Sequence, residues 1–166
     1  MEKAENRKTQ NRIGKIQQAL RESRADGLLI EDRSNRRYLT GADVWQGSLI
    51  VTEEKAVLLV DFRYYQMAIS GVKGCDVKLC KNVDEGIGQM VKDWNIHWLG
   101  FETGGLSYLR HKKLEAIIGG ARLDEETCGD KLVKEQRKIK DAEELSYLRQ
   151  AQEISDRAYE HILNVA

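Results

Sequence analysis

The sequence contains no proline and no long uninterrupted run of apolar residues. The absence of proline excludes Pro-rich recognition segments and stiff proline linkers. A membrane-spanning helix needs about 20 predominantly apolar residues, and no such stretch occurs. The first residues also lack the apolar centre of a secretory signal peptide. We therefore expect a cytoplasmic protein that has no membrane partner.

An excess of charge of one sign is also missing, and cysteine is scarce. Lysine and arginine together number 27, as do aspartate and glutamate, and this balance argues against a nucleic-acid partner. Cys75, Cys80 and Cys128 lack zinc-site spacing, and three cysteines cannot all pair. We interpret them as reduced thiols. Cys75 and Cys80 are expected on opposite faces of a short strand between them.

What the sequence does contain is an alternation of apolar runs and amphipathic segments. Residues 48–52 and 56–60 are two β-branched runs joined by a short polar link, which predicts a hairpin. Residues 28–30 form a continuous apolar run, typical of a strand covered on both faces. Further strands are expected at residues 76–79, 98–102 and 121–125. Strands alternating with helices, with one hairpin, predict an α/β fold of three layers, α/β/α, around a mixed sheet.

Apolar residues at spacings of three and four predict helices between these strands. Residues 1–12 are almost wholly polar, and we expect them to be frayed before a helix that starts near Ile13. Asn82 with Glu85, and Asp141 with Glu144, have the form of capping boxes that begin two further helices.

The composition changes near residue 127, where a charge-rich segment follows the last expected strand. We expect residues 1–126 to form one domain and residues 127–166 to be a connector and the first helix of another domain. An apolar stripe runs from Leu145 to Ile162, and the chain supplies little to cover it. Because uncovered apolar stripes promote association, we expect residues 141–166 to self-associate or to remain mobile.

Three motifs occur in a fixed order over nearly the whole chain. Tyr-Leu-Thr-Gly at residues 38–41 precedes the hairpin, Asp-Phe-Arg-Tyr follows it at residues 61–64, and a charged helix entry lies at residues 137–145. In these motifs the chain resembles the N-terminal domain of the creatinase/prolidase family, which includes Xaa-Pro dipeptidases and Xaa-Pro aminopeptidases.

The resemblance implies a non-catalytic domain with a fold related to ribonuclease H-like proteins. In that family a separate catalytic domain of pita-bread fold holds two divalent metals (manganese, cobalt or zinc). We expect this domain to be absent here, so that the chain alone binds no cofactor and hydrolyses nothing. The implied partners are the protein's own catalytic domain, a second subunit in a homodimer and a small peptide substrate.

The residues themselves show no active site. His97, His111 and His161 lack the spacing of metal ligands; we interpret His97 as structural and the other two as solvated. No phosphate-binding loop and no nucleophile motif occurs.

Charged and aromatic residues gather where the second hairpin strand ends, and strand ends are where ligands bind in α/β sheets. The resemblance implies that this domain borders the substrate cleft. Its candidate cleft residues are Tyr38, Trp45, Arg63 and Tyr64. Aromatic rings suit a proline ring, and an arginine can hold a carboxylate with two hydrogen bonds. The alternative is structural: the tyrosines close the end of the sheet, and Arg63 pairs with Asp61 or caps a helix.

Two other functions remain open from the sequence. One is the N-terminal domain of a creatinase-like amidinohydrolase, which shares the two-domain plan. The other is a protein-binding module that has lost catalysis, as in the family's histone-chaperone relatives. The balanced charge, without acidic or basic tails, argues against the second.

Overall fold

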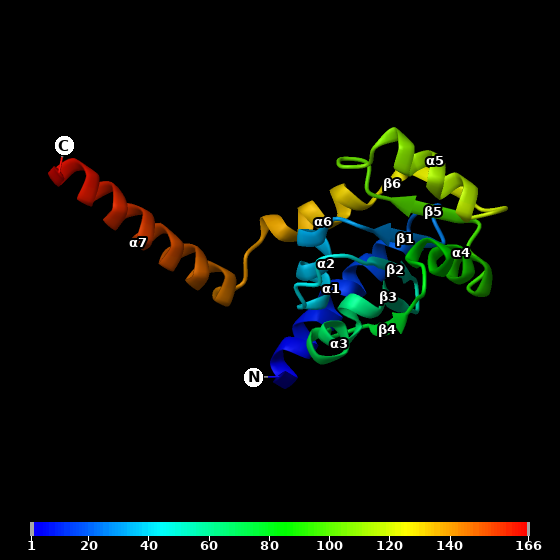
Figure 1. Ribbon diagram of the computed structural model, residues 1–166, viewed down its shortest axis with the longest axis horizontal. Coiled ribbons are helices and arrows are strands. Elements are labelled where there is room, and N and C mark those ends of the chain that lie inside the picture. Colours follow the sequence, from blue (N-terminus) through cyan, green and yellow to red (C-terminus); the bar gives the residue numbers. More distant parts are fainter. Residues whose placement is uncertain (1, 166) are drawn as a thin grey trace. The chain divides into compact units, whose positions relative to one another are not determined.

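The structure is a computed structural model that describes residues 2–165, with side chains from residue 8. A six-stranded mixed sheet forms the centre of the unit that ends at Val133 (Figure 1). The strands are β1 (Gly27–Ile30), β2 (Ser48–Thr52), β3 (Ala56–Val60), β4 (Asp76–Leu79), β5 (Trp98–Phe101) and β6 (Arg122–Cys128). The helices are α1 (Glu2–Arg21), α2 (Arg33–Thr40), α3 (Phe62–Gly71), α4 (Val83–Asp93), α5 (Tyr108–Ile117), α6 (Gly129–Lys138) and α7 (Ala142–Val165).

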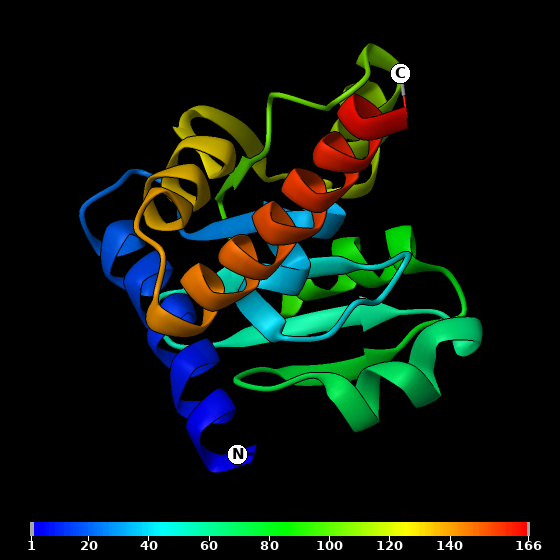
Figure 2. The same ribbon diagram turned by 90° about the vertical axis from the view of Figure 1, so that its left-hand side faces the viewer.

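The strand β2 gives the sheet its mixed character. The strand order is β4-β3-β2-β1-β5-β6, and β2 is antiparallel to both neighbours while every other adjacent pair is parallel. The predicted hairpin is therefore confirmed, and so is the α/β fold with a mixed sheet. Residues that follow β1, β3 and β4 lie at the same edge as residues that precede β2. We call this edge the carboxyl edge (Figure 2).

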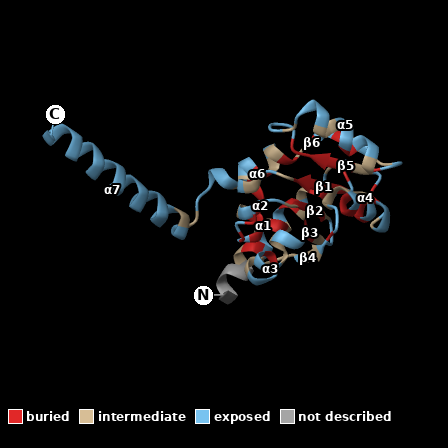
Figure 3. Ribbon diagram, in the orientation of Figure 1, coloured by how far each residue is buried: buried red, intermediate tan, exposed pale blue. Residues whose placement is uncertain are grey.

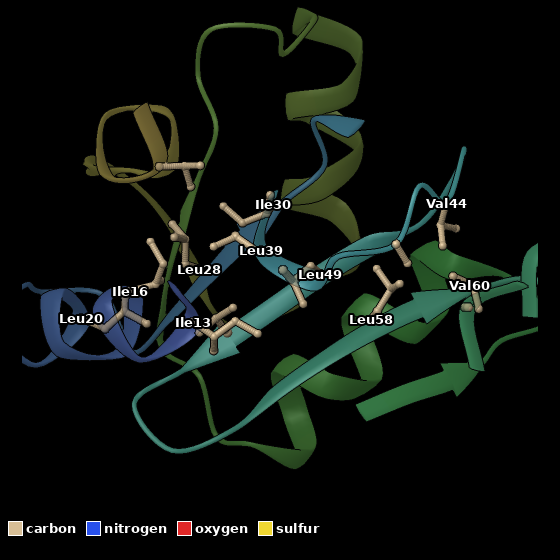
Figure 4. Packing of buried hydrophobic residues seen from close by; sticks show 14 of the residues in the cluster. Ile13, Ile16, Leu20, Leu28, Ile30, Leu39, Val44, Leu49, Leu58 and Val60 are labelled. Carbon is tan, nitrogen blue, oxygen red and sulfur yellow. The ribbon is translucent and has the colours of Figure 1, made fainter. Parts of the chain in front are cut away.

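Two apolar clusters form the core, one on each face of the sheet. Figure 3 shows the buried residues along the chain, and Figure 4 shows side chains of the first cluster. Side chains alternate between the faces along β1: Leu28 and Ile30 belong to one cluster, and Leu29 belongs to the other. Helices α1, α2, α3 and α6 contribute to the first cluster, and α4 and α5 to the second. Cys75 packs against the first cluster and Cys80 lies in the second, which confirms their placement on opposite faces.

The start of α1 differs from the sequence prediction. We expect residues 1–12 to be frayed, but α1 begins at Glu2, and Thr9 is buried. Arg12 donates a hydrogen bond of 2.8 Å to the backbone oxygen of Tyr38. Polar residues are thus held in the helix by tertiary contacts, which no local pattern reveals. The side chains of residues 1–7 lie outside the described part.

Local capping explains where other helices begin. The carboxylate of Asp32 accepts from the backbone N–H of Asn35 at the start of α2, and Gly41 ends α2 in the left-handed conformation. Asn82 caps α4 by accepting from the N–H of Asp84. Asp141 and Glu144 each accept the other's backbone N–H, at 2.9 and 3.0 Å, which confirms the second capping box.

The chain divides into two compact units, one ending at Val133 and one beginning at Lys134. Within the first unit, Val133 is fully buried in the core. Within the second, α7 has no buried residue. The expected domain boundary after residue 126 stays a prediction about the whole protein. The last strand, β6, ends at Cys128 and is longer than the predicted residues 121–125, since a register shift opposite Gly100 and Phe101 extends its pairing.

Candidate functional site at the carboxyl edge

A polar groove of about 530 Å³ lies at the carboxyl edge of the sheet. Its walls come from the segments that follow β1, β3 and β4, from the segment that enters β2, and from α5. The lining residues are Glu31, Gln46, Gly47, Ser48, Asp61, Arg63, Lys81, Asn82, Val83, Asp84 and Arg110. Crevices outside the carboxyl ends of strands are where open α/β sheets bind ligands.

Arg110 joins two walls of the groove. Its Nε and Nη2 donate to the two carboxylate oxygens of Glu31 at 2.9 and 2.6 Å, and its Nη1 donates to Asp84 Oδ1 at 2.6 Å. Lys113 Nζ lies 2.5 Å from the other oxygen of Asp84. Ser48 donates to Glu31 at 2.9 Å. These charged hydrogen bonds tie β1, β2, α4 and α5 together at one point.

The hydrogen bonds of this network shift the pKa values of Asp84 and Arg110. Burial by itself would raise the pKa of Asp84, but hydrogen bonds from Lys113 and Arg110 hold that pKa below its ordinary value. Hydrogen bonds to Glu31 raise the pKa of the Arg110 guanidinium, against the opposing effect of burial. Asp84 and Arg110 are therefore both charged at neutral pH, and the network is occupied by its own ion pairs.

A buried guanidinium lies beneath the groove and fixes the loop between α2 and β2. Arg36 donates to the backbone oxygens of Glu31 and Gly47, both at 2.5 Å, and to those of Val44 and Trp45 at 3.2 and 3.1 Å. Its Nε has no partner among the described residues. Burial lowers the pKa of Arg36, despite the raising effect of nearby carboxylates such as Glu31.

Gly47 completes this loop for a steric reason. Its φ is +156°, and a Cβ there would come within 2.8 Å of the Leu59 backbone oxygen. A side chain at position 47 would thus push the loop away from β3. Glycine is required where the groove wall lies against the sheet.

Glu102, which directly follows β5, fixes the start of α2 through three hydrogen bonds. It accepts from the backbone N–H groups of Glu31 and Asp32 and from the side chain of Asn35, each at 2.6 Å. Burial raises the pKa of Glu102, although these three hydrogen bonds favour its charged form. Arg36 and Glu102, both buried, thus fix through their separate hydrogen bonds the backbone on which the groove is built.

Of the four candidates from the sequence, Arg63 lines the groove. Its Nε and Nη2 donate to Asp61 Oδ2 at 3.0 and 2.6 Å, and Nη2 also donates to Gln46 Oε1 at 2.9 Å. The hydrogen bond with Arg63 lowers the pKa of Asp61. Asp61 also caps α3 by accepting from the N–H of Arg63. The pairing that the structural alternative names is present, and none of the hydrogen bonds of Arg63 to other described residues uses its Nη1.

Trp45 lies outside the groove on the adjoining loop, with 60% of its surface exposed. The Arg33 guanidinium carbon lies 3.8 Å from the centre of the indole ring. Arg33 is itself held by Asp43 through two hydrogen bonds of 2.8 Å. The exposed ring is therefore supported on one side while the Arg36 hydrogen bonds fix its backbone.

Tyr38 and Tyr64 are half-buried and pack against the first apolar cluster. The guanidinium carbon of Arg12 lies 3.9 Å from the Tyr38 ring centre, and that of Arg63 lies 5.3 Å from the Tyr64 ring centre. The structure thus brings the side chains of Arg63 and Tyr64 together. Gln46, in the loop between α2 and β2 (residues 41–47, the Trp45 loop), accepts a hydrogen bond from Arg63. The structure does not gather the four candidates around one cavity.

Glu31, Lys81, Asp84 and Arg110 line the groove but are not among the residues predicted from the sequence. A signal exists for Glu31 and Lys81, since each follows the apolar end of a strand, as Asp61 does. Arg110 carries no such signal, because it lies within a helix and reaches the groove only through the packing of α5.

In the described part of the chain, no three His, Cys, Asp or Glu side chains lie together in a way that could hold a metal ion. The described residues therefore do not offer the ligands of the two-metal site that the resemblance implies for the family's catalytic domain. His111 packs edge-on against Phe101, with ring centres 5.7 Å apart, so its interpretation as simply solvated is wrong. Between residues 2 and 165, no helix has the length and apolar character needed to cross a bilayer.

Comparison with known proteins matches residues 12–139 to the Creatinase/Prolidase N-terminal domain. The uncharacterized peptidase YqhT of Bacillus subtilis is 32% identical over 139 residues, which are 83% of this chain and 38% of that protein. The structure resembles an Xaa-Pro dipeptidase from Bacillus anthracis with a TM-score of 0.88 and 27% identity, covering 95% of this chain and 44% of that one.

A third relative is a domain solved by itself. The N-terminal domain of cytoplasmic peptidase PepQ from Mycobacterium tuberculosis H37Rv has a TM-score of 0.67 and 26% identity, and the match covers 75% of this chain and 97% of that one. By contrast, this chain spans less than half the length of the Bacillus relatives. The family match covers most of the sequence, and the chain belongs to the creatinase/prolidase N-terminal domain family.

Proposed function

We propose that this chain is the non-catalytic N-terminal domain of an Xaa-Pro dipeptidase or aminopeptidase, and that its carboxyl edge forms cleft wall and subunit contacts. The main observation behind this proposal concerns Trp45. Its indole ring is exposed, and its backbone oxygen accepts a hydrogen bond from the buried Arg36. The names of the Bacillus relatives, a peptidase and an Xaa-Pro dipeptidase, support the same function.

The physical case for Trp45 is the combination of exposure and rigidity. An exposed indole contributes to an interface when it is buried by a partner, and it loses little conformational entropy when its position is already fixed. A proline ring of a substrate, or a second subunit of a homodimer, offers the apolar surface that the indole would cover.

Arg63 is the second proposed cleft residue. Asp61 occupies its Nε and Nη2, so a substrate carboxylate would meet Nη1 or would displace Asp61. Metal ions would belong to the catalytic domain. We further propose a cytoplasmic location, supported by the cytoplasmic peptidase named among the relatives.

The test joins this chain to the catalytic domain of YqhT, in place of that peptidase's own N-terminal domain. In this fusion, Trp45→Ala and Arg63→Ala should leave metal content and melting temperature unchanged. For a contact made equally with substrate and transition state, KM rises while kcat stays nearly constant. Loss of a charged hydrogen bond at Arg63 lowers kcat/KM by about tenfold or more, and Arg63→Lys does not restore it fully.

The matched control is Arg21→Ala. Arg21 forms an exposed pair with Glu53 at 3.9 Å, at the opposite edge of the sheet, and its loss should leave kinetics unchanged. If Trp45→Ala and Arg63→Ala lower the melting temperature while kcat/KM stays constant, both residues are structural.

A further inference from the structure

The outer edge of β4 has no partner strand among the described residues. β4 is the last strand of the sheet and pairs with β3 on one side (Figure 1). The backbone N–H of Cys80, directly after β4, donates to the Val60 oxygen of β3 at 2.8 Å. Because backbone groups alternate in direction along a strand, those of Val77 and Leu79 point outward, away from β3. These outward groups form a template on which another strand can pair.

The two faces of β4 differ in their chemistry. The side chains of Cys75 and Val77 pack against the first apolar cluster, on the face that α3 covers. Lys78 points to the other face, where its Nζ lies 3.8 Å from the sulfur of Met90 in the second cluster. Asp76 shares that face with Lys78, since side chains alternate along a strand. One side of the edge is therefore apolar, and the other carries one negative and one positive charge.

Helix α3 extends the apolar side of this edge. A Cβ at Gly71 would lie 3.3 Å from the Cβ of Ala42, so that side of α3 faces the loop between α2 and β2. Ile69 lies on nearly the opposite side, since two positions turn a helix by about 200°. Phe62, seven positions earlier, shares the side of Ile69. Because α3 packs on β3 and β4, this side is turned towards the outer edge of β4. Phe62, Ile69 and Leu79 are all exposed.

The charges of β4 match a second copy of the same strand. A two-fold axis perpendicular to the sheet makes two β4 strands antiparallel. With Val77 opposite Val77 of the second copy, each Asp76 faces Lys78 of the other copy, and the two Val77 residues exchange two backbone hydrogen bonds. The next register in one direction places Lys78 opposite Lys78, and the next in the other direction places Asp76 opposite Asp76. Like charges directly opposite destabilise a strand pair, so a single register is favoured.

We propose that two copies of this chain pair edge to edge through β4, antiparallel and with Val77 at the two-fold axis. The two α3 helices then lie on the same face of the joined sheet, and the exposed Phe62 and Ile69 of each copy meet across the axis. A strand of four residues supplies few hydrogen bonds, so the pair is weak and is best detected by trapping. The contact includes none of the groove residues and is tested without a catalytic domain, so it does not depend on the proposed peptidase function.

Disulfide trapping tests the register. One chain carries Asp76→Cys and another carries Lys78→Cys, both with Cys128→Ser, and the mixture is oxidised. Opposite residues of this kind have Cα atoms about 4.5 Å apart, within disulfide range, and the second ion pair of the dimer is kept. The mixed disulfide should form about tenfold faster than that of either variant alone, because only the mixture places two thiols opposite each other. Burial raises the pKa of the Cys75 thiol to about 12, and Cys80 is buried, so neither competes.

A charge swap tests the ion pairs, with Val77→Cys as the reporter because this position faces itself across the axis. Asp76→Lys should slow formation of the Val77→Cys disulfide about tenfold, since both cross-strand pairs become like-charged. Adding Lys78→Asp to the same chain should restore the rate, since opposite charges face each other again. A mixture of this double variant with the chain of natural charges should form disulfides within each kind and few between the two kinds.

Glu53→Cys mixed with Lys55→Cys is the matched control, because both residues are exposed in the turn between β2 and β3 and report random collision. Any association of residues 141–166 acts on all variants alike. Two results would overturn the proposal: a mixed disulfide at positions 76 and 78 that forms no faster than the control or the single variants, or a double swap that fails to restore the rate. The melting temperature of each variant shows that it is folded, so a missing disulfide reports on pairing.

Discussion

At the scale of single residues, the buried Arg36 fixes the backbone on which the candidate site is built. Its guanidinium donates to four backbone oxygens, three of them in the loop between α2 and β2. Removing it leaves these oxygens without this donor and removes a positive charge that interacts with Glu102. Buried polar groups that lose their partners destabilise a fold more than exposed ones do.

We predict that Arg36→Met destabilises the protein by roughly 3 kcal/mol, the magnitude expected when one member of a buried charge network is removed. Urea denaturation followed by circular dichroism measures the change. The neighbour Arg37, whose side chain is 65% exposed, is the control, and Arg37→Met should change stability by about 0.5 kcal/mol or less. Equal effects of the two substitutions would show that the Arg36 hydrogen bonds contribute little.

At the scale of elements, the link between α4 and α5 depends on Asp84. This carboxylate in the first turn of α4 receives Arg110 and Lys113 from α5, two positions that lie one helical turn apart. Its own helix N-terminus also favours a negative charge. The two helices cover the same face of the sheet, and Asp84 and Arg110 both line the groove.

The lowered pKa of Asp84 predicts a pH-dependent stability. A carboxyl group whose folded pKa lies below its unfolded value, about 3.9, stabilises the fold above that value and loses this contribution as pH falls through the folded pKa. Asp84→Asn should therefore cost roughly 1–2 kcal/mol at pH 7, from two lost charged hydrogen bonds.

Denaturation at several pH values checks this prediction. The difference between wild type and Asp84→Asn should stay constant above about pH 5 and shrink below about pH 4. Glu53→Gln is the control, because the exposed pair of Glu53 with Arg21 contributes little. A difference independent of pH down to the acid transition would contradict a lowered pKa.

At the scale of the whole molecule, the second unit presents an apolar stripe along α7. Leu145, Leu148, Ile154 and Ile162 are all exposed, at 42%, 53%, 60% and 61%. No residue of α7 is buried. Both observations agree with the uncovered apolar stripe that the sequence predicts from Leu145 to Ile162. Exposed stripes of this size usually mark a surface that another protein surface covers.

We predict that the chain self-associates in a concentration-dependent way through α7. Sedimentation velocity over a range of concentrations should show a rising weight-average mass. The double substitution Leu148→Lys and Ile154→Lys should return the chain to a monomer, whereas Gln150→Lys with Gln152→Lys, which adds the same charge to exposed polar positions of α7, should not. A chain that stays monomeric at all concentrations would contradict the prediction.

Local patterns in the sequence were enough to determine the architecture of this protein. The hairpin of β2 and β3, the caps at Asn82 and Asp141, and the placement of Cys75 and Cys80 depend on periodicity and on hydrogen bonds between near neighbours. These signals are contained within a few residues, so they predict the elements, and the alternation of elements predicts the α/β class. The motifs at residues 38–41 and 61–64 likewise led to the correct family.

Tertiary structure alone decided which side chains share the groove. Arg110 reaches Glu31 across 79 positions of sequence, and Arg12 reaches Tyr38 across 26. Such contacts depend on how helices pack on the sheet, which a pattern of neighbouring residues does not contain. The pairing of Arg63 with Asp61, two positions away, could be named from the sequence. Its hydrogen bond to Gln46, and the groove that it shares with Lys81, depend on β3, β4 and the loop between α2 and β2 meeting at one edge.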